Sequence, residues 1–161
     1  MKKIKWIIIL VNLFLLMGYF NYSVVKKEEL LSDGNLILLK LAPVDPRSLM
    51  QGDYMRLRYD ISDRFRPDSI SKRGYCVVKL DSAGVAYMVR IQKGKSPKLE
   101  NEFVIEYAAG KRNINIGAES YFFEEGQATK YEKAKYGGVK VDASGNSILV
   151  GLYNEQLKKI K

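Results

Sequence analysis

Hydrophobic residues are concentrated in one long stretch near the N-terminus and recur afterwards in short segments. Residues 6–25 contain no ionisable group except two tyrosine hydroxyls, and lysines lie on both sides of them. Twenty helical residues rise about 30 Å, which matches the hydrocarbon thickness of a bilayer. The pattern therefore predicts a transmembrane helix near the start of the chain.

A cleaved signal peptide is the alternative interpretation, because the densest apolar part, residues 7–20, is short and contains Asn12. Residues 19–25 are mostly bulky, however, where a cleavage site needs small side chains, and we favour an uncleaved anchor. Three lysines and the free amine precede the stretch, whereas Lys26 and Lys27 follow it beside two glutamates. The lysine count predicts a cytoplasmic N-terminus, with the rest of the chain outside the cytoplasm.

The remaining sequence consists of short apolar or alternating segments separated by turn signals, which is typical of a β domain. The clearest alternation places the apolar side chains Met55, Leu57, Tyr59 and Ile61 on one face of a strand. Strands are expected at residues 35–42, 53–61, 75–80, 85–91, 103–107, 113–116, 121–123, 139–141 and 148–152. Asp and Gly in the turns 81–84 and 142–146 predict two hairpins.

Two short helices are expected within this β domain. In residues 45–52, Asp45 is placed to cap a helix, Pro46 suits its first position and Gly52 its end. Residues 125–136 carry apolar side chains at helical spacing and precede a Gly-Gly pair. Polar loops are expected at 61–73 and 92–101.

These elements predict a mainly β fold, an antiparallel small barrel or sandwich with one or two short helices, preceded by a single transmembrane helix. The expected parts are a Lys-rich end and anchor (1–27), a β-rich domain (28–154) and a basic tail (155–161). At 161 residues the chain has room for one ordinary domain.

The charge distribution and the composition argue against several functions. The formal net charge of +9 suggests nucleic acid at first sight, but residues 1–27 contribute +5 and residues 155–161 contribute +2. The β domain is therefore nearly neutral, and we expect no nucleic-acid partner. Without histidine there is no Ser-His-Asp triad, and the single Cys76 cannot form an internal disulfide or a multi-thiolate zinc site. We expect no metal and no cofactor.

One motif stands out in the first part of the β domain. Residues 52–59 read G-D-Y-x-x-L-x-Y, and this string resembles the bacterial GDYXXLXY family, which is named for it and has no assigned activity. Residues 116–126, together with Tyr131, Glu132, Gly145 and residues 151–153, are also similar to that family. The resemblance covers about residues 36–153. It implies a single-pass protein of the bacterial cytoplasmic membrane, with a multipass membrane protein as the expected kind of partner.

The motif has a structural and a functional interpretation. In the first, Asp53 accepts hydrogen bonds from backbone amides at a tight strand entry, and Leu57 and Tyr59 point into the core. In the second, the opposite face forms an aromatic and cationic surface for a carboxylate, a phosphate-bearing lipid head or an acidic peptide. The candidate binding residues are Arg47, Gly52, Asp53, Tyr54, Arg56, Leu57, Arg58 and Tyr59.

Enzymatic alternatives rest on fewer residues. Ser48 and Lys72 are the candidates for a serine/lysine dyad, which needs no histidine, in a hydrolase resembling a degenerate signal peptidase. The nucleophile position of those enzymes falls on Val44 here, which speaks against it. A glycosidase-like carboxylate pair would have to come from the glutamates at 119, 124, 125 and 132, which look more like a solvated helix face. We therefore expect a non-enzymatic accessory or binding subunit of a membrane complex.

Overall fold

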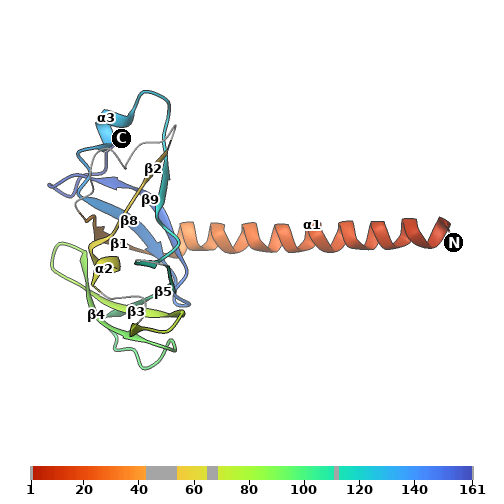
Figure 1. Ribbon diagram of the computed structural model, residues 1–161, viewed down its shortest axis with the longest axis horizontal. Coiled ribbons are helices and arrows are strands. Elements are labelled where there is room, and N and C mark those ends of the chain that lie inside the picture. Colours follow the sequence, from red (N-terminus) through yellow and green to blue (C-terminus); the bar gives the residue numbers. More distant parts are fainter. Residues whose placement is uncertain (1, 43–53, 65–68, 111–112, 161) are drawn as a thin grey trace.

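A long helix, α1 (Lys2–Asp33), projects away from a β domain in the computed structural model (Figure 1). The structure describes residues 2–42, 54–64, 69–110 and 113–160. Within these ranges α1 is the one helix long and apolar enough to cross a membrane, and none of its most apolar window is buried. The sequence expected such a helix over residues 6–25. In the structure it continues in register to Asp33, so that its last eight residues rise about 12 Å beyond the apolar stretch.

The β domain is built on a seven-stranded sheet that curls into a half-barrel, with the strand order β6-β5-β3-β4-β1-β8-β9. All neighbours in it are antiparallel except β1 and β4, which are parallel. Strands β2 and β7 form a separate antiparallel pair. The strands are β1 (Asn35–Lys40), β2 (Tyr54–Arg56), β3 (Arg73–Leu80), β4 (Val85–Gln92), β5 (Glu102–Ala109), β6 (Ile114–Asn115), β7 (Ser120–Phe122), β8 (Tyr136–Val141) and β9 (Ser147–Tyr153). The predicted mainly β fold is confirmed.

Both predicted hairpins are present and use the same turn chemistry. In the β3–β4 turn, an Asp81 carboxylate oxygen accepts hydrogen bonds from the amides of Ala83 and Val85, each 2.9 Å long. In the β8–β9 turn, Asp142 accepts in the same way from Ser144 and Asn146. Gly84 and Gly145 adopt φ values of 80° and 89° in these turns, a conformation that costs glycine little.

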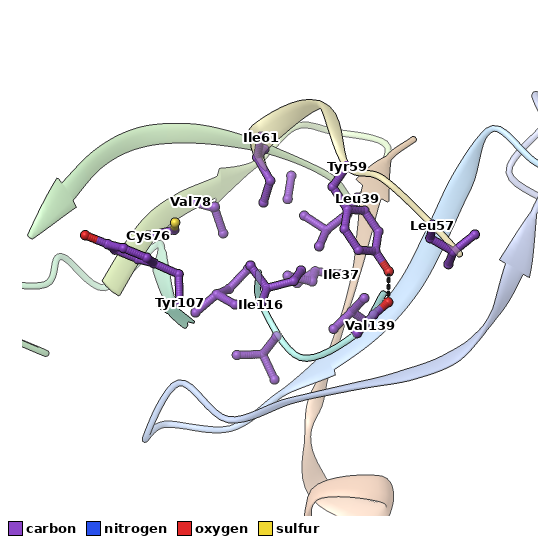
Figure 2. Close-up of a cluster of buried hydrophobic side chains, with 14 of the residues drawn as sticks. Ile37, Leu39, Leu57, Tyr59, Ile61, Cys76, Val78, Tyr107, Ile116 and Val139 are labelled. Carbon is purple, nitrogen blue, oxygen red and sulfur yellow. Dashed lines mark hydrogen bonds between the residues drawn. The ribbon is translucent and has the colours of Figure 1, made fainter. Parts of the chain in front are cut away.

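The core fills the concave side of the curled sheet. It contains inward-facing residues of most strands, among them Ile37, Leu39, Cys76, Ile105 and Val139, all fully buried (Figure 2). Apolar side chains from the chain around β2 and from residues 114–118 close the open side of the half-barrel. The domain therefore depends on contacts between segments far apart in sequence.

Several predicted boundaries are corrected by the structure. Strand β2 ends at Arg56, and residues 60–63, expected partly as strand and partly as loop, form the short helix α2 (Asp60–Asp63). The helix expected at 125–136 is reduced to α3 (Ala128–Tyr131). Gly137 and Gly138 do not end that helix but belong to β8. The helix expected at 45–52 lies outside the described residues.

The two glycines of β8 have a packing reason. A Cβ on Gly137 would come within 2.9 Å of the Tyr59 ring, and a Cβ on Gly138 would overlap with the Tyr153 ring. Contacts that close are not tolerated in a packed interior. The Gly-Gly pair therefore makes room for two aromatic rings rather than ending a helix.

The C-terminal residues fold back along β9. Tyr153 forms an isolated bridge with Lys159, and the Ile160 amide donates a 2.8 Å hydrogen bond to the Leu152 carbonyl. This pairing covers one end of an edge strand that would otherwise expose backbone donors and acceptors.

Candidate functional site

The motif segment pairs with a second part of the chain, around residues 119–122, that is far from it in sequence. Strand β2 pairs with β7 in the register Tyr54–Phe122, Met55–Tyr121 and Arg56–Ser120. Just beyond it, the Leu57 amide donates a 2.7 Å hydrogen bond to the carbonyl of Glu119. Residues 54–57 of the motif and residues 119–122, from two regions that resemble the same family, therefore lie side by side.

The last tyrosine of the motif is a central part of the core. Tyr59 is fully buried, and its hydroxyl donates a 2.5 Å hydrogen bond to the carbonyl of Ala118 (dashed line in Figure 2). Its ring lies against the backbone of Gly137. Burial, and secondarily the charge of Glu119, raises the pKa of the Tyr59 hydroxyl far above its ordinary value. Tyr59 is therefore held as a neutral hydrogen-bond donor.

The alternation predicted around the motif is confirmed for the residues that the structure describes. Met55, Leu57 and Ile61 are buried, while Arg56 and Arg58 are exposed. Leu57 and Tyr59, which we named among the binding candidates, thus face the core. Tyr59 therefore serves to hold the strand, whereas Leu57 also lines the hollow described below.

The exposed face carries ion pairs that partly neutralise its arginines. The Arg58 guanidinium donates to Asp63 at 2.7 and 2.9 Å, and Arg64 pairs with Asp60 at 2.9 Å. Exposed pairs of this kind contribute little to stability, about 0–1 kcal/mol. Arg56 forms no ion pair with any described residue, and it is therefore the cation of the motif most available to a partner.

A hollow of about 720 Å³ lies beside this face. Apolar side chains of Leu41, Met55, Leu57 and Tyr131 line part of it. Its charged lining residues are Lys40, Arg58, Asp60, Glu132, Lys135 and Glu155. The size is that of a small-ligand or side-chain pocket, and the balanced charges fit a polar partner segment better than a strongly charged one.

Four of the candidate residues cannot be placed. Arg47, Ser48, Gly52 and Asp53 lie outside the described residues, and Tyr54 is described by its backbone alone. Lys72 is exposed, and its carbonyl accepts a hydrogen bond from the Ala109 amide. Because Ser48 lies outside the described residues, the structure does not place the expected serine relative to Lys72.

The glutamates considered for a carboxylate pair do not form one. Glu124, Glu125 and Glu132 are exposed, and Glu119 accepts a hydrogen bond from the amide of Ile116. A glycosidase acid must be shielded from water to stay protonated, which the three exposed glutamates are not. No group of three or more Cys, Asp or Glu side chains in the described ranges is arranged to hold a metal ion.

The most buried charge of the domain was not anticipated from the sequence. The Glu102 side chain is 1% exposed and forms a two-pronged ion pair with Arg90, in which both hydrogen bonds are 2.8 Å long. The Leu99 amide also donates to it, and Lys79 lies 3.9 Å away. The Arg90 guanidinium, helped by the Leu99 amide, lowers the pKa of the Glu102 carboxyl to about 2. The pair joins β4 to the start of β5.

Comparison with known proteins gives one match. A family model described as GDYXXLXY protein matches residues 16–152, which is most of the chain and includes the end of α1. No curated protein and no solved structure matches the chain. With β2, the segment from 116 to 126 and the buried Leu57 and Tyr59 all inside the matched region, the chain belongs to the GDYXXLXY protein family.

Proposed function

We propose that the protein is a single-pass protein of the bacterial cytoplasmic membrane whose β domain, outside the cytoplasm, is a non-enzymatic binding subunit of a membrane complex. The observation that carries this proposal is α1. The apolar side chains of α1 from Ile4 to Val25 are exposed. Exposed apolar surface of this extent favours contact with the apolar interior of a membrane. The helix then enters the domain without a flexible connection.

The junction between α1 and the domain supports an anchor that is kept rather than removed. Leu30 is 7% exposed against the β domain, and the Gly34 amide donates a 3.1 Å hydrogen bond to the Leu30 carbonyl. The Lys140 ammonium donates to the carbonyls of Leu31 and Ser32 at the end of the helix. Residues 30–32 thus contact the folded domain and belong to the same helix as the apolar stretch.

The proposed binding role rests on two features of the motif segment. Arg56, on its exposed face, is free of ion pairs among the described residues. The neighbouring hollow has Met55 and Leu57 in its apolar floor and Arg58 and Asp60 among its charged lining residues. An interface with an apolar centre and a polar rim is the common form for a protein partner. The hydrolase alternative has no observation in its favour, because Ser48, its expected nucleophile, lies outside the described residues.

Site-specific crosslinking in native membranes tests the binding role. A photoreactive residue replaces Arg56 at the motif face, and a matched chain carries it at Lys95, in the loop between β4 and β5. We expect a discrete crosslinked product with another membrane protein from position 56 and none from position 95. Equal labelling from both positions, or products containing this chain alone, would contradict the proposal.

A further inference from the structure

A second hollow lies between the end of α1 and the β domain. It has a volume of about 1040 Å³ and is lined by residues 19–35 of the helical end, the ends of β3 and β5, and the β8–β9 turn. Figure 1 shows α1 leaving the domain on this side. The groove is distinct from the hollow beside the motif, with which it shares no residue.

The position of the groove relative to the proposed membrane can be inferred from the α1 residues that line it. Tyr19 and Tyr22 line the groove from the last turns of the apolar stretch, and Lys26, Lys27 and Asp33 line it from the polar continuation. The headgroup layer of each leaflet is about 5–7 Å thick, and eight helical residues rise about 12 Å. The groove therefore spans the level at which lipid headgroups lie, with tyrosines at the interface where they are favoured.

The charges of the groove are of both signs and are not paired with one another. Its cations are Lys26, Lys27 and Arg73, and none of them forms an ion pair with a described residue. Lys26 lies 4.7 Å from the centre of the Tyr22 ring, which orients its ammonium along the helix. Three unpaired cations around one groove can bind a phosphate group.

The acidic lining residues balance these cations. Glu29, Asp33 and Glu106 form no ion pair among the described residues, whereas the carboxylate of Asp142 is occupied by amides of its own turn and by the Asn146 side chain. A purely anionic ligand would meet four repelling carboxylates and three attracting cations. A ligand that carries a phosphate and an ammonium group satisfies both sets.

We propose that this groove binds the headgroup of a zwitterionic phospholipid, phosphatidylethanolamine, from the outer leaflet of the membrane. Its phosphate contacts the cations at 26, 27 and 73, its ammonium contacts the carboxylates, and its acyl chains follow α1 beside Tyr19 and Tyr22. This inference rests on the proposed membrane anchoring. A lipid seated in this way contacts the helix and the domain together, and so fixes the orientation of the domain over the bilayer.

Native mass spectrometry of the full chain in detergent, with equal amounts of phosphatidylethanolamine and phosphatidylglycerol, tests the site. We expect one phosphatidylethanolamine to remain bound in preference to phosphatidylglycerol. The double variant Arg73→Gln/Glu106→Gln removes one group of each sign from the domain side, and we expect about tenfold or greater loss of the adduct. Lys95→Gln/Glu100→Gln makes the same change of charge away from the groove and is expected to retain it.

Equal adducts of the two lipids, or an adduct unchanged by Arg73→Gln/Glu106→Gln, would overturn the inference. Circular dichroism of each variant establishes that the domain is folded. Carbonate extraction of the same membranes separates the two proposals. A chain that stays in the membrane but carries no phosphatidylethanolamine refutes the lipid site alone, whereas a chain released by carbonate refutes the anchoring and the lipid site together.

Discussion

Tyr59 shows how a residue of the family motif can be fixed by the fold. Its hydroxyl is the donor for a buried carbonyl, and its ring fills the space left by the missing side chain of Gly137. Neither partner is close to it in sequence. A tyrosine is required here because phenylalanine lacks the donor and a smaller residue leaves a cavity.

Replacing Tyr59 by phenylalanine is expected to lower the free energy of unfolding by about 1–3 kcal/mol, because the Ala118 carbonyl then loses its buried partner. Chemical denaturation of the full chain in detergent measures this. Tyr87→Phe is the control, since Tyr87 is 47% exposed on β4, and we expect a change within about 0.5 kcal/mol. Equal stabilities of the two variants would show that the Tyr59 hydrogen bond does not matter.

The same contact predicts coupling between Tyr59 and Gly137. Gly137→Ala forces a methyl group to within 2.9 Å of the ring, which is expected to destabilise the domain by about 1–3 kcal/mol. In the double variant Tyr59→Leu/Gly137→Ala the clash is relieved. The two effects should therefore fall short of additivity by about 0.5–3 kcal/mol in a double-mutant cycle, and strict additivity would contradict the packing described.

Glu102 gives the domain a defined response to acid. Its pKa is about 2 in the folded state and about 4.3 in an unfolded chain, so that the folded state binds fewer protons between these values. Acid therefore favours unfolding. The stabilisation is complete above about pH 5 and is lost as the pH falls towards 2.

The variant Glu102→Gln lacks the titrating carboxyl and is expected to be less stable at neutral pH, with a shallower loss of stability between about pH 5 and 2. Thermal unfolding followed by circular dichroism across this range measures the slope. Glu100→Gln, an exposed neighbour, should retain the wild-type slope. An identical slope for Glu102→Gln would mean that the ion pair with Arg90 does not control the acid response.

At the scale of elements, the junction between α1 and the β domain is held by few groups. Lys140 reaches from β8 to the last carbonyls of α1, and a cation is favourable at the C-terminal end of a helix. Lys140→Met keeps most of the side-chain stem but removes the donors. Backbone amides near residues 30–34 are then expected to exchange with solvent about 2- to 10-fold faster.

Hydrogen exchange of the full chain in detergent measures this junction. Lys133→Met is the control, because Lys133 is exposed near α3 and is not bonded to α1. Unchanged exchange at residues 30–34 in Lys140→Met would contradict a junction held by Lys140. It would also weaken the case that the helix and the domain act as one body.

Some helices and strands could be predicted from the sequence more closely than others. Strands β3, β4 and β9 were predicted to within two residues at each end, since each carries an apolar pattern and the turns beside them contain Asp and Gly. Of β8 only residues 139–141 were predicted, because Gly137 and Gly138 were assigned to the end of a helix. Strand β7 has the predicted length, whereas β6 covers two of the four residues expected at 113–116. The long helix was recognised from residues 6–25, but its extension to Asp33 was not, because Lys26 to Asp33 owe their helical form partly to contacts with the domain.

Other features depend on partners distant in sequence and leave no local signal. The parallel pairing of β1 with β4 and the β2–β7 pair require contacts across most of the domain. Gly137 and Gly138 carry the usual signal for the end of a helix, yet tertiary packing against Tyr59 and Tyr153 places them in a strand. Glu102 and Arg90, which form an ion pair, are twelve residues apart in sequence. A single charged residue in an alternating strand gives no sign of its partner, so this pair could not be predicted.

The candidate site was predicted in part. The alternation around the motif correctly separated the buried Leu57 and Tyr59 from the exposed Arg56 and Arg58. The hollow beside them and the pairing of Arg58 with Asp63 could not be foreseen, since both depend on how α2 and α3 pack. The groove at α1 depends on how the whole helix is oriented against the domain. No sequence motif identifies its lining residues, so it could not be predicted.

At the scale of the whole molecule, the charge distribution fits a membrane protein better than its net value suggests. Most of the net positive charge comes from the two ends of the chain, while the β domain between them is almost neutral. The molecule combines an apolar helix, a mixed-charge groove where that helix meets the domain, and a motif segment on which we propose a binding face. This arrangement is consistent with a domain that is held at a membrane surface and presents one face to a partner.

The central claim is that α1 crosses the membrane once and leaves the β domain outside the cytoplasm. Labelling of single cysteines tests it directly, because the native Cys76 is buried and burial raises its pKa to about 12, so the wild-type chain should not react. We expect Lys95→Cys to react with a membrane-impermeant maleimide in spheroplasts, and Lys5→Cys to react only after lysis. Protection of Lys95→Cys in spheroplasts, or a mature chain that lacks residues 1–25 and is soluble, would contradict the account.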